Sequence, residues 1–118
     1  MDGLYRDKLL SHYHAPKNYG LMEDFDVEAK GENPLCGDSI TVRLKLKGSR
    51  ISEISFENKG CVISRAAASL LFEDIKGKTG EMIRSLTFSS IIGLLEVEPM
   101  PARIKCALLP LETIQKAV

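Results

Sequence analysis

The chain has 118 residues, a length that predicts a single domain over residues 1–118 and leaves no room for two hydrophobic cores. Apolar residues make up 44% of it and charged residues 27%, which is typical of a globular protein and excludes a disordered one. Sixteen basic residues balance sixteen acidic ones, and only 6% of residues are aromatic, so the composition gives no support to nucleic-acid binding.

The cysteine count and the N-terminus predict the compartment. Three cysteines cannot close a disulfide framework, and this points to reduced thiols. The first residues show no apolar signal region after a basic start, and no apolar run approaches the roughly 18 residues of a membrane helix. We therefore expect a cytoplasmic protein without a membrane segment.

The first third of the chain predicts a helix followed by a less regular stretch. Residues 4–14 carry an apolar stripe at helical spacing, and Pro16 is expected to end the helix. His12 and His14 belong to no cluster of potential ligands in the sequence, so we interpret them as solvated histidines at the helix end. Residues 16–33, rich in acidic side chains, read as a loop or a loosely held strand.

A β-hairpin is predicted next. Residues 40–47 alternate between apolar and polar side chains, the pattern of a strand with one buried face. Residues 48–49, Gly-Ser, form a plausible hairpin turn, and residues 51–56 read as the return strand. The apolar residues of that strand change parity once, which predicts a β-bulge near residues 52–53.

The rest of the chain is predicted to be helical. Residues 64–76 and 87–95 read as helices, and Thr79 as the cap of a short helix between them. Residues 103–118 are also helical in character, although Pro110 implies a kink or a helix start near that position. Strands that precede helices in this way predict an α+β fold, with a small antiparallel sheet of about three strands packed against several helices.

Cys36 and Asp38 lie in one predicted turn. The segment Asn-Pro-Leu-Cys-Gly-Asp over residues 33–38 combines two turn formers with a thiol and a carboxylate. A thiolate and a carboxylate presented together are a plausible half of a metal site. On this segment alone, a purely structural role is favoured, namely a turn with a buried cysteine and an aspartate that binds local amides.

Cys61 and Cys106 are each predicted near a helix start. The positive end of the helix dipole favours a thiolate at Cys61, and Lys105 and Arg103 do so at Cys106. For Cys61, a ligand or nucleophile and a buried core thiol are equally supported. For Cys106 alone the core interpretation is favoured. No Cys-x-x-Cys pair is present, so a zinc finger is unsupported.

Taken together, these segments resemble a known family. The blocks 33–38, 60–69 and 103–106, with the opening stretch 4–20, are similar to the three cysteine blocks and the N-terminus of the NifU/IscU/SufU iron–sulfur cluster assembly scaffolds. The blocks stand in the family's order, and the resemblance covers nearly the whole chain.

The resemblance implies a ligand set and a cofactor. Cys36, Asp38, Cys61 and Cys106 take the places of the cluster and metal ligands, and Lys105 is an auxiliary residue that either pairs with Asp38 or keeps a thiolate ready. Three thiolates and a carboxylate suit a transient [2Fe–2S] cluster assembled from iron, or a Zn²⁺ ion in the isolated protein. The carboxylate binds less tightly than a fourth thiolate, which suits a scaffold that releases its cluster.

The resemblance also implies a function and partners. As a scaffold and not an enzyme, the protein would receive persulfide sulfur from a PLP-dependent cysteine desulfurase on Cys36, Cys61 or Cys106. Electrons would come from a donor such as ferredoxin, and the cluster would pass to apo-proteins, with a homodimer as one form of the cluster-bound state. The alternatives are a zinc-bound sulfurtransferase that accepts sulfur from the desulfurase, and a structural domain with buried thiols.

Two departures bear on the subtype. Lys105 stands where Isc-type members carry histidine, and residues 99–103 read Pro-Met-Pro-Ala-Arg in place of Leu-Pro-Pro-Val-Lys. Recognition by the specialised Hsp70 chaperone is therefore doubtful. The motifs are Suf-like, but the 44 residues between Cys61 and Cys106 leave little room for the insertion of Suf-type members.

Overall fold

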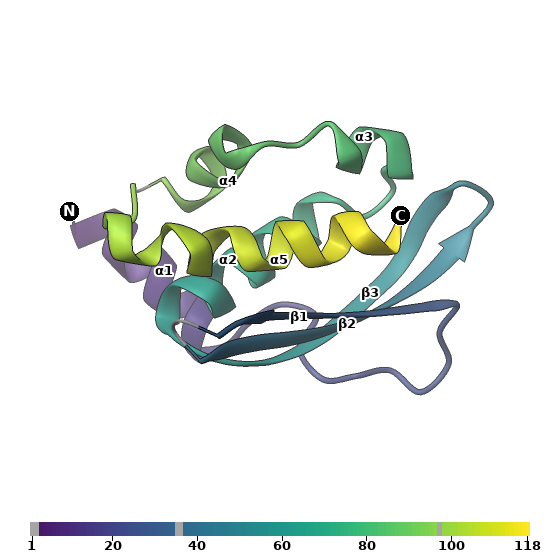
Figure 1. The fold of residues 1–118 in the computed structure, drawn as a ribbon, viewed down its shortest axis with the longest axis horizontal. Helices are drawn as coiled ribbons and strands as arrows, with labels where there is room; N and C mark the ends of the chain where they lie inside the picture. The colour runs from purple at the N-terminus through teal and green to yellow at the C-terminus, as the bar shows by residue number, and fades with distance from the viewer. Residues whose placement is uncertain (1–2, 35–36, 97) are drawn as a thin grey trace.

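The computed structural model describes residues 3–34, 37–96 and 98–118. Figure 1 shows a three-stranded sheet with helices on one side of it, so the predicted α+β class is confirmed. Cys36, one of the predicted ligands, lies outside the described residues. None of the helices in the described part is long and apolar enough to cross a membrane.

The sheet consists of β1 (Val27–Asn33), β2 (Asp38–Lys47) and β3 (Arg50–Lys59), antiparallel and in this order. The predicted hairpin is confirmed, since β2 and β3 pair across the Gly48–Ser49 turn. The predicted bulge is also present: Lys45 pairs with Glu53 and Leu46 with Ile51, which leaves Ser52 as the extra residue. Ile40, Val42 and Leu44 on the apolar face of β2 are buried as the alternation predicts. Leu46, at the hairpin end of the same face, is 39% exposed, because the bulge interrupts the pairing there.

The stretch 16–33 divides into a loop and a regular strand. The loop runs beside the free edge of β3, where Gly20 N donates to Phe56 O at 2.9 Å and Phe56 N to Asn18 O at 3.0 Å. From Val27 onward the chain pairs with β2 residue by residue. The second half is therefore a fully paired strand rather than a loosely held one, because its ladder to β2 compensates for its weak apolar pattern.

The described residues form five α-helices: α1 (Gly3–His14), α2 (Val62–Asp74), α3 (Gly80–Arg84), α4 (Phe88–Leu95) and α5 (Ile104–Ala117), the last preceded by a 3₁₀ turn, Pro101–Arg103. In Figure 1, α5 extends along the sheet with α2 beside it, and α3 and α4 form a further layer. The core between these layers includes Val42, Phe56, Ala67, Leu71 and Ile114. Three consecutive alanines in α2 allow the close approach of this helix to its neighbours.

Two details of the helices test the sequence predictions. Thr79 caps α3 as predicted, its side chain accepting from Met82 N at 3.3 Å. Pro110 does not mark a helix start, because α5 begins at Ile104 and continues through it. Proline has no N–H to donate to the carbonyl of Cys106 one turn earlier, and packing must compensate, since Pro110 is buried.

His12 is half-buried and not solvated, contrary to the sequence interpretation. Its Nδ1 lies 2.7 Å from Ser69 Oγ, which also accepts from Lys17 N at 2.8 Å. Ser69 itself is fully buried in α2, so the hydrogen bond fastens α1 to α2. His14 is exposed, as expected.

Candidate metal centre

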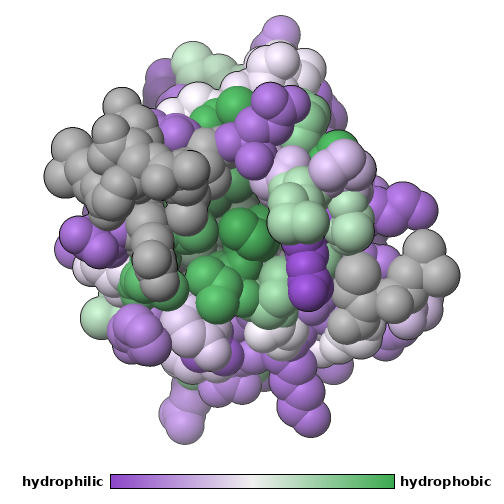
Figure 2. Space-filling model, turned by 90° about the vertical axis from the view of Figure 1, so that its left-hand side faces the viewer, coloured by the Kyte–Doolittle hydropathy of each residue, from purple (hydrophilic) through white to green (hydrophobic). Residues whose placement is uncertain are grey.

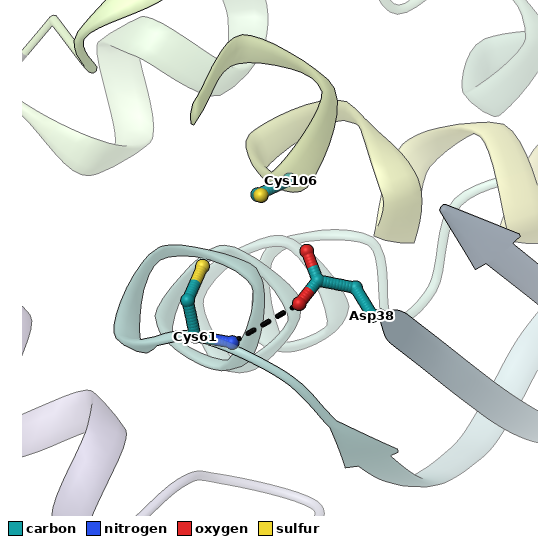
Figure 3. A group of neighbouring side chains, drawn as sticks. All are labelled: Asp38, Cys61 and Cys106. Carbon is teal, nitrogen blue, oxygen red and sulfur yellow. Dashed lines mark hydrogen bonds between the residues drawn. The ribbon is translucent and has the colours of Figure 1, made fainter. Parts of the chain in front are cut away.

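Asp38, Cys61 and Cys106 come together although they are far apart in the sequence. Their ligand atoms, one carboxylate oxygen and two sulfurs, all lie within 4.8 Å of one another (Figure 3). Each comes from the start of a different element: Asp38 begins β2, Cys61 precedes α2, and Cys106 lies in the first turn of α5. The site is therefore built from the ends of three elements, so a small shift of one of these ends moves a candidate ligand directly.

Asp38 is held by one oxygen and leaves the other available. The residue is 3% exposed, and its Oδ1 accepts a hydrogen bond from Cys61 N at 3.2 Å. Its Oδ2 is buried and has no hydrogen-bond partner among the described residues. An unpartnered buried carboxylate oxygen is costly, and a bound cation would remove that cost.

Gly60 makes room for this carboxylate. Its φ is 152°, in the range that favours glycine. A Cβ at this position would lie 2.2 Å from Asp38 Oδ1 and 2.8 Å from Asp38 Cγ. Any other residue would thus push the Asp38 side chain away from the Cys61 amide. Sequence reasoning missed this role, for which the only local signal is a glycine immediately before a candidate ligand.

Cys61 is fixed by the turn that leads into α2. It occupies the N-cap position with extended backbone angles, and its carbonyl accepts from Ser64 Oγ at 3.3 Å. Asn58 supports the turn from β3: its Nδ2 donates to Ser64 Oγ at 3.4 Å, and its Oδ1 accepts from Arg65 Nε at 2.9 Å. The Cys61 side chain remains partly exposed.

Cys106 is fully buried and approaches Cys61 from the opposite helix. Because both thiols lie at helix N-termini, two positive dipole ends converge on the group. These dipole ends would offset part of the repulsion between the thiolates and the Asp38 carboxylate when the three bind a metal ion. The electrostatics of the fold thus support a set of anionic ligands.

The donor set fits a single tetrahedral cation. With Zn–S bonds of about 2.3 Å and Zn–O bonds of about 2.0–2.2 Å, neighbouring donors of Zn²⁺ lie roughly 3.4–3.8 Å apart. Donor atoms already within 4.8 Å of one another reach this geometry by small side-chain rotations. The unpartnered Asp38 Oδ2 is the oxygen that would complete the set.

The remaining predicted site residues are not all part of this group. Lys105 is exposed, and because Asp38 Oδ2 has no partner in the described ranges, the suggested Lys105–Asp38 pair is not formed. Neither His12 nor His14 belongs to the group of possible metal ligands found among the described residues. Cys36 lies outside those residues, so its predicted place beside Asp38 remains a prediction.

Known proteins resemble the chain over almost its full length. The zinc-dependent sulfurtransferase SufU of Bacillus subtilis is 34% identical, over 100% of this chain and 91% of SufU. The iron–sulfur cluster assembly scaffold protein IscU 1 of Archaeoglobus fulgidus is 33% identical, over 98% of this chain and 74% of that protein. A crystal structure titled as a putative SUF-system scaffold, from Fervidobacterium islandicum, matches with a TM-score of 0.77 and 27% identity, covering 99% of this chain and 95% of that one.

The alignments also bear on the subtype. The match to SufU extends over 135 aligned residues, more than the 118 residues of this chain, so SufU carries residues that this chain lacks. The match to IscU 1 extends over 115 residues, but the match to the IscU of Thermotoga maritima extends over 131, so the length of the alignment does not separate the two subtypes. A family model described as the NifU-like N terminal domain matches residues 4–118. The chain therefore belongs to the family of NifU-like N-terminal domains, which includes the IscU and SufU proteins of iron–sulfur cluster assembly.

Proposed function

We propose that this protein binds one Zn²⁺ ion through Asp38, Cys61 and Cys106, with Cys36 as the expected fourth ligand, and accepts sulfur from a cysteine desulfurase for iron–sulfur cluster assembly. The observation that carries the proposal is the compact donor set with its unpartnered Asp38 Oδ2. The name of the SufU relative, a zinc-dependent sulfurtransferase, supports the same assignment.

The spacing of the donors favours a single ion in the resting protein. A [2Fe–2S] cluster distributes its ligands over two iron atoms, and ligands of different irons are further apart than those of one tetrahedral ion. The three described donor atoms all lie within 4.8 Å of one another. This supports a mononuclear site, and cluster binding would require at least one donor to move outward.

Sulfur transfer requires an accessible thiolate. Its Sγ attacks the outer sulfur of the desulfurase persulfide, a new S–S bond forms, the donor's own S–S bond breaks, and the desulfurase cysteine leaves as a thiolate. No oxidant and no added proton are needed. Of the two described thiols, Cys61 is partly exposed whereas Cys106 is fully buried, so Cys61 is the one a partner reaches without opening the fold. Cys36 remains the third candidate acceptor.

The cysteine ligands and Asp38 would have different roles around the ion. When bound, Zn²⁺ stabilises the thiolate form of its cysteine ligands. Asp38 is the hard donor among soft ones, so it is the ligand expected to exchange most readily. Its hydrogen bond from Cys61 N keeps the carboxylate next to the site when it is displaced, which makes the exchange reversible.

The surface at this end supports a protein partner. Figure 2 looks onto the end of the molecule where α1 and α5 begin, and hydrophobic residues gather there between hydrophilic ones. Val62 and Ile63, which directly follow Cys61, are only partly buried. Apolar surface beside a reactive group is typical of a docking site for another protein, here the desulfurase.

A second candidate is the scaffold function itself, in which a [2Fe–2S] cluster is assembled from iron and persulfide sulfur, with electrons from a donor such as ferredoxin, and passed to apo-proteins. The IscU relatives named as scaffolds, at 33% and 31% identity, favour it. The Asp38 carboxylate also suits release of a cluster, because it binds iron less tightly than a thiolate.

The test combines metal analysis with sulfur transfer. We expect protein purified anaerobically to contain one zinc per chain, to increase desulfurase turnover of L-cysteine, and to gain the mass of sulfur on a cysteine. Asp38→Ala should lose zinc and most of the stimulation, whereas Glu57→Ala, an exposed change on β3, should keep both. Unchanged desulfurase turnover, together with a stable visible cluster spectrum after reconstitution with iron, would reject the sulfurtransferase in favour of the scaffold.

A further inference from the structure

Arg65 occupies a position in α2 that disfavours a cation. It lies in the first turn of the helix, four residues after the N-cap Cys61, where the positive end of the helix dipole repels a positive charge. The side chain is nevertheless half-buried and held by two tyrosines and an asparagine from outside α2. A cation fixed so firmly at an unfavourable place points to a role other than the stability of the helix.

Two tyrosine rings contact the guanidinium group. The Arg65 Cζ atom lies 5.1 Å from the ring centroid of Tyr13 in α1 and 5.1 Å from that of Tyr19 in the loop after α1. The Tyr19 ring packs edge-on against Phe56 of β3, with 5.2 Å between the ring centroids. Cation–π contacts restrict where a guanidinium group can lie, so α1 and the following loop together place Arg65.

Arg65 sets the direction of a chain of hydrogen bonds. A guanidinium group can only donate, so the oxygen of the Asn58 amide has to face it. Arg65 Nε donates to Asn58 Oδ1 at 2.9 Å, and Nη2 donates to the Asn58 carbonyl oxygen at 3.5 Å. The other end of the same amide is therefore a donor, and Asn58 Nδ2 donates to Ser64 Oγ at 3.4 Å. A hydroxyl group has one proton, which Ser64 donates to Cys61 O at 3.3 Å.

This chain of hydrogen bonds ends on the backbone of a candidate ligand. Asn58 and Ser64 are buried, so water does not readily replace their bonds. Ser64 holds the Cys61 carbonyl, and Asp38 Oδ1 accepts from Cys61 N at 3.2 Å, so Cys61 is held on both sides. If the Asn58 amide turned over, its oxygen would take the Ser64 proton, and the Cys61 carbonyl would lose this donor.

We propose that Arg65 is a positioning residue for Cys61 and acts through the Asn58 amide and Ser64. Its own position depends on the two tyrosines, so the packing of α1 and the following loop influences the metal centre. The effect on metal affinity rests on the proposed function, whereas the orientation of the Asn58 amide does not require a metal ion.

The sign of the change in zinc affinity separates this role from that of a nearby charge. Arg65→Glu and Asn58→Asp both make the surroundings of the ion more negative, and by attraction alone this would strengthen the binding of a cation. The carboxylate of Arg65→Glu accepts and turns the Asn58 amide over, and that of Asn58→Asp cannot donate to Ser64. Both variants should therefore weaken zinc binding about tenfold in competition with a chelator, as for the loss of a group that orients a ligand. Lys59→Glu, the same charge change at an exposed residue of β3, should cause no loss.

Arg65→Lys separates the direction of the hydrogen bonds from packing. The lysine keeps a donor for Asn58 Oδ1 but gives up the planar group that stacks on the tyrosines. This variant should lower the free energy of unfolding and keep the zinc affinity of the wild type. An equal loss of zinc affinity in Arg65→Lys and Arg65→Glu would show that packing alone matters and would overturn the proposal.

Nuclear Overhauser contacts in metal-free protein test the same chain of hydrogen bonds without zinc. The side-chain NH₂ protons of Asn58 should lie near Ser64 Hβ in the wild type and in Arg65→Lys, and should turn toward residue 65 in Arg65→Glu. Absence of the Ser64 contact in the wild type, or an unchanged Asn58 amide in Arg65→Glu, would overturn the proposal. So would zinc binding at least as tight as in the wild type in Asn58→Asp, the variant that decides if Arg65→Glu does not fold. If even the wild type binds no zinc, the proposed function fails and the Asn58 contacts alone decide the role of Arg65.

Discussion

Replacing Gly60 by alanine is the sharpest test of how the metal centre is built. The added Cβ would lie 2.2 Å from Asp38 Oδ1 and 3.0 Å from Ser64 Oγ, and the residue would keep a φ of 152°. The carboxylate must move, and its hydrogen bond from Cys61 N is lost. A single methyl group thereby acts on two of the three described donors.

The size of the effect follows from two contributions. A backbone conformation that only glycine adopts easily costs about 1–3 kcal/mol in another residue. A hydrogen bond to a charged group contributes about 1.5–3 kcal/mol. We therefore expect Gly60→Ala to lower the free energy of unfolding by roughly 2.5–6 kcal/mol and to weaken zinc binding about 10–100-fold, as for the loss of a group that orients a ligand.

Urea unfolding of metal-free protein and zinc competition with a chromophoric chelator measure the two effects. Gly93→Ala is the control, because Gly93 lies on the exposed side of α4 with nothing near its Cβ. That change should be neutral or stabilise by up to about 1 kcal/mol. In the background of Asp38→Ala the Gly60→Ala penalty should shrink, since the carboxylate is gone. Wild-type zinc affinity in Gly60→Ala, or strictly additive effects of the two changes, would refute this account of the site.

Three further predictions concern thiols, protons and metal. In reduced, metal-free protein, iodoacetamide should modify Cys61 before Cys106, because Cys61 is partly exposed and Cys106 is fully buried; peptide mass spectrometry that finds Cys106 modified first would contradict the arrangement. Burial, reinforced by neighbouring lysines, lowers the pKa of His12 below its usual 6.5, so the unfolded chain binds more protons and stability falls as the pH drops below about 6.5. His12→Gln should make the urea midpoint less dependent on pH in this range, whereas His14→Gln should not. If the urea midpoint of His12→Gln depends on pH as steeply as that of the wild type, His12 is not the source of the pH dependence. Removal of zinc by a chelator should lower the thermal midpoint, and an unchanged midpoint would show that metal and fold are uncoupled.

Local patterns were sufficient for most of the secondary structure. The alternation over residues 40–47 and the change of parity after Ile51 led to the hairpin and to its bulge at Ser52, because the side-chain period of a strand is a direct consequence of its geometry. Thr79 was recognisable as a cap for a similar reason. Strand β1 was harder to recognise, since its pairing with β2 and not its own pattern holds it in place.

Contacts between distant segments were not predictable in this way. The resemblance placed Asp38, Cys61 and Cys106 in one site, and the structure brings them within 4.8 Å. No spacing rule, however, indicated that Gly60 must lack a side chain because of Asp38. The burial of His12 likewise depends on Ser69, 57 residues away. In both cases the deciding contact comes from a residue that is distant in the sequence. The local sequence alone indicates only a solvated helix end or a flexible glycine.

The origin of the three donors at element ends bears on how the proposed metal site would exchange a ligand. The buried Asp38 Oδ2 has no partner among the described residues, and such an oxygen is costly. A cation bound between Asp38, Cys61 and Cys106 would remove this cost. Because Asp38 accepts a hydrogen bond from Cys61 N through one oxygen, its carboxylate would stay beside the site even when it is not a ligand. The close approach of Gly60 to Asp38 restricts the carboxylate as well, so a backbone position that carries no ligand of its own would control how Asp38 holds the ion.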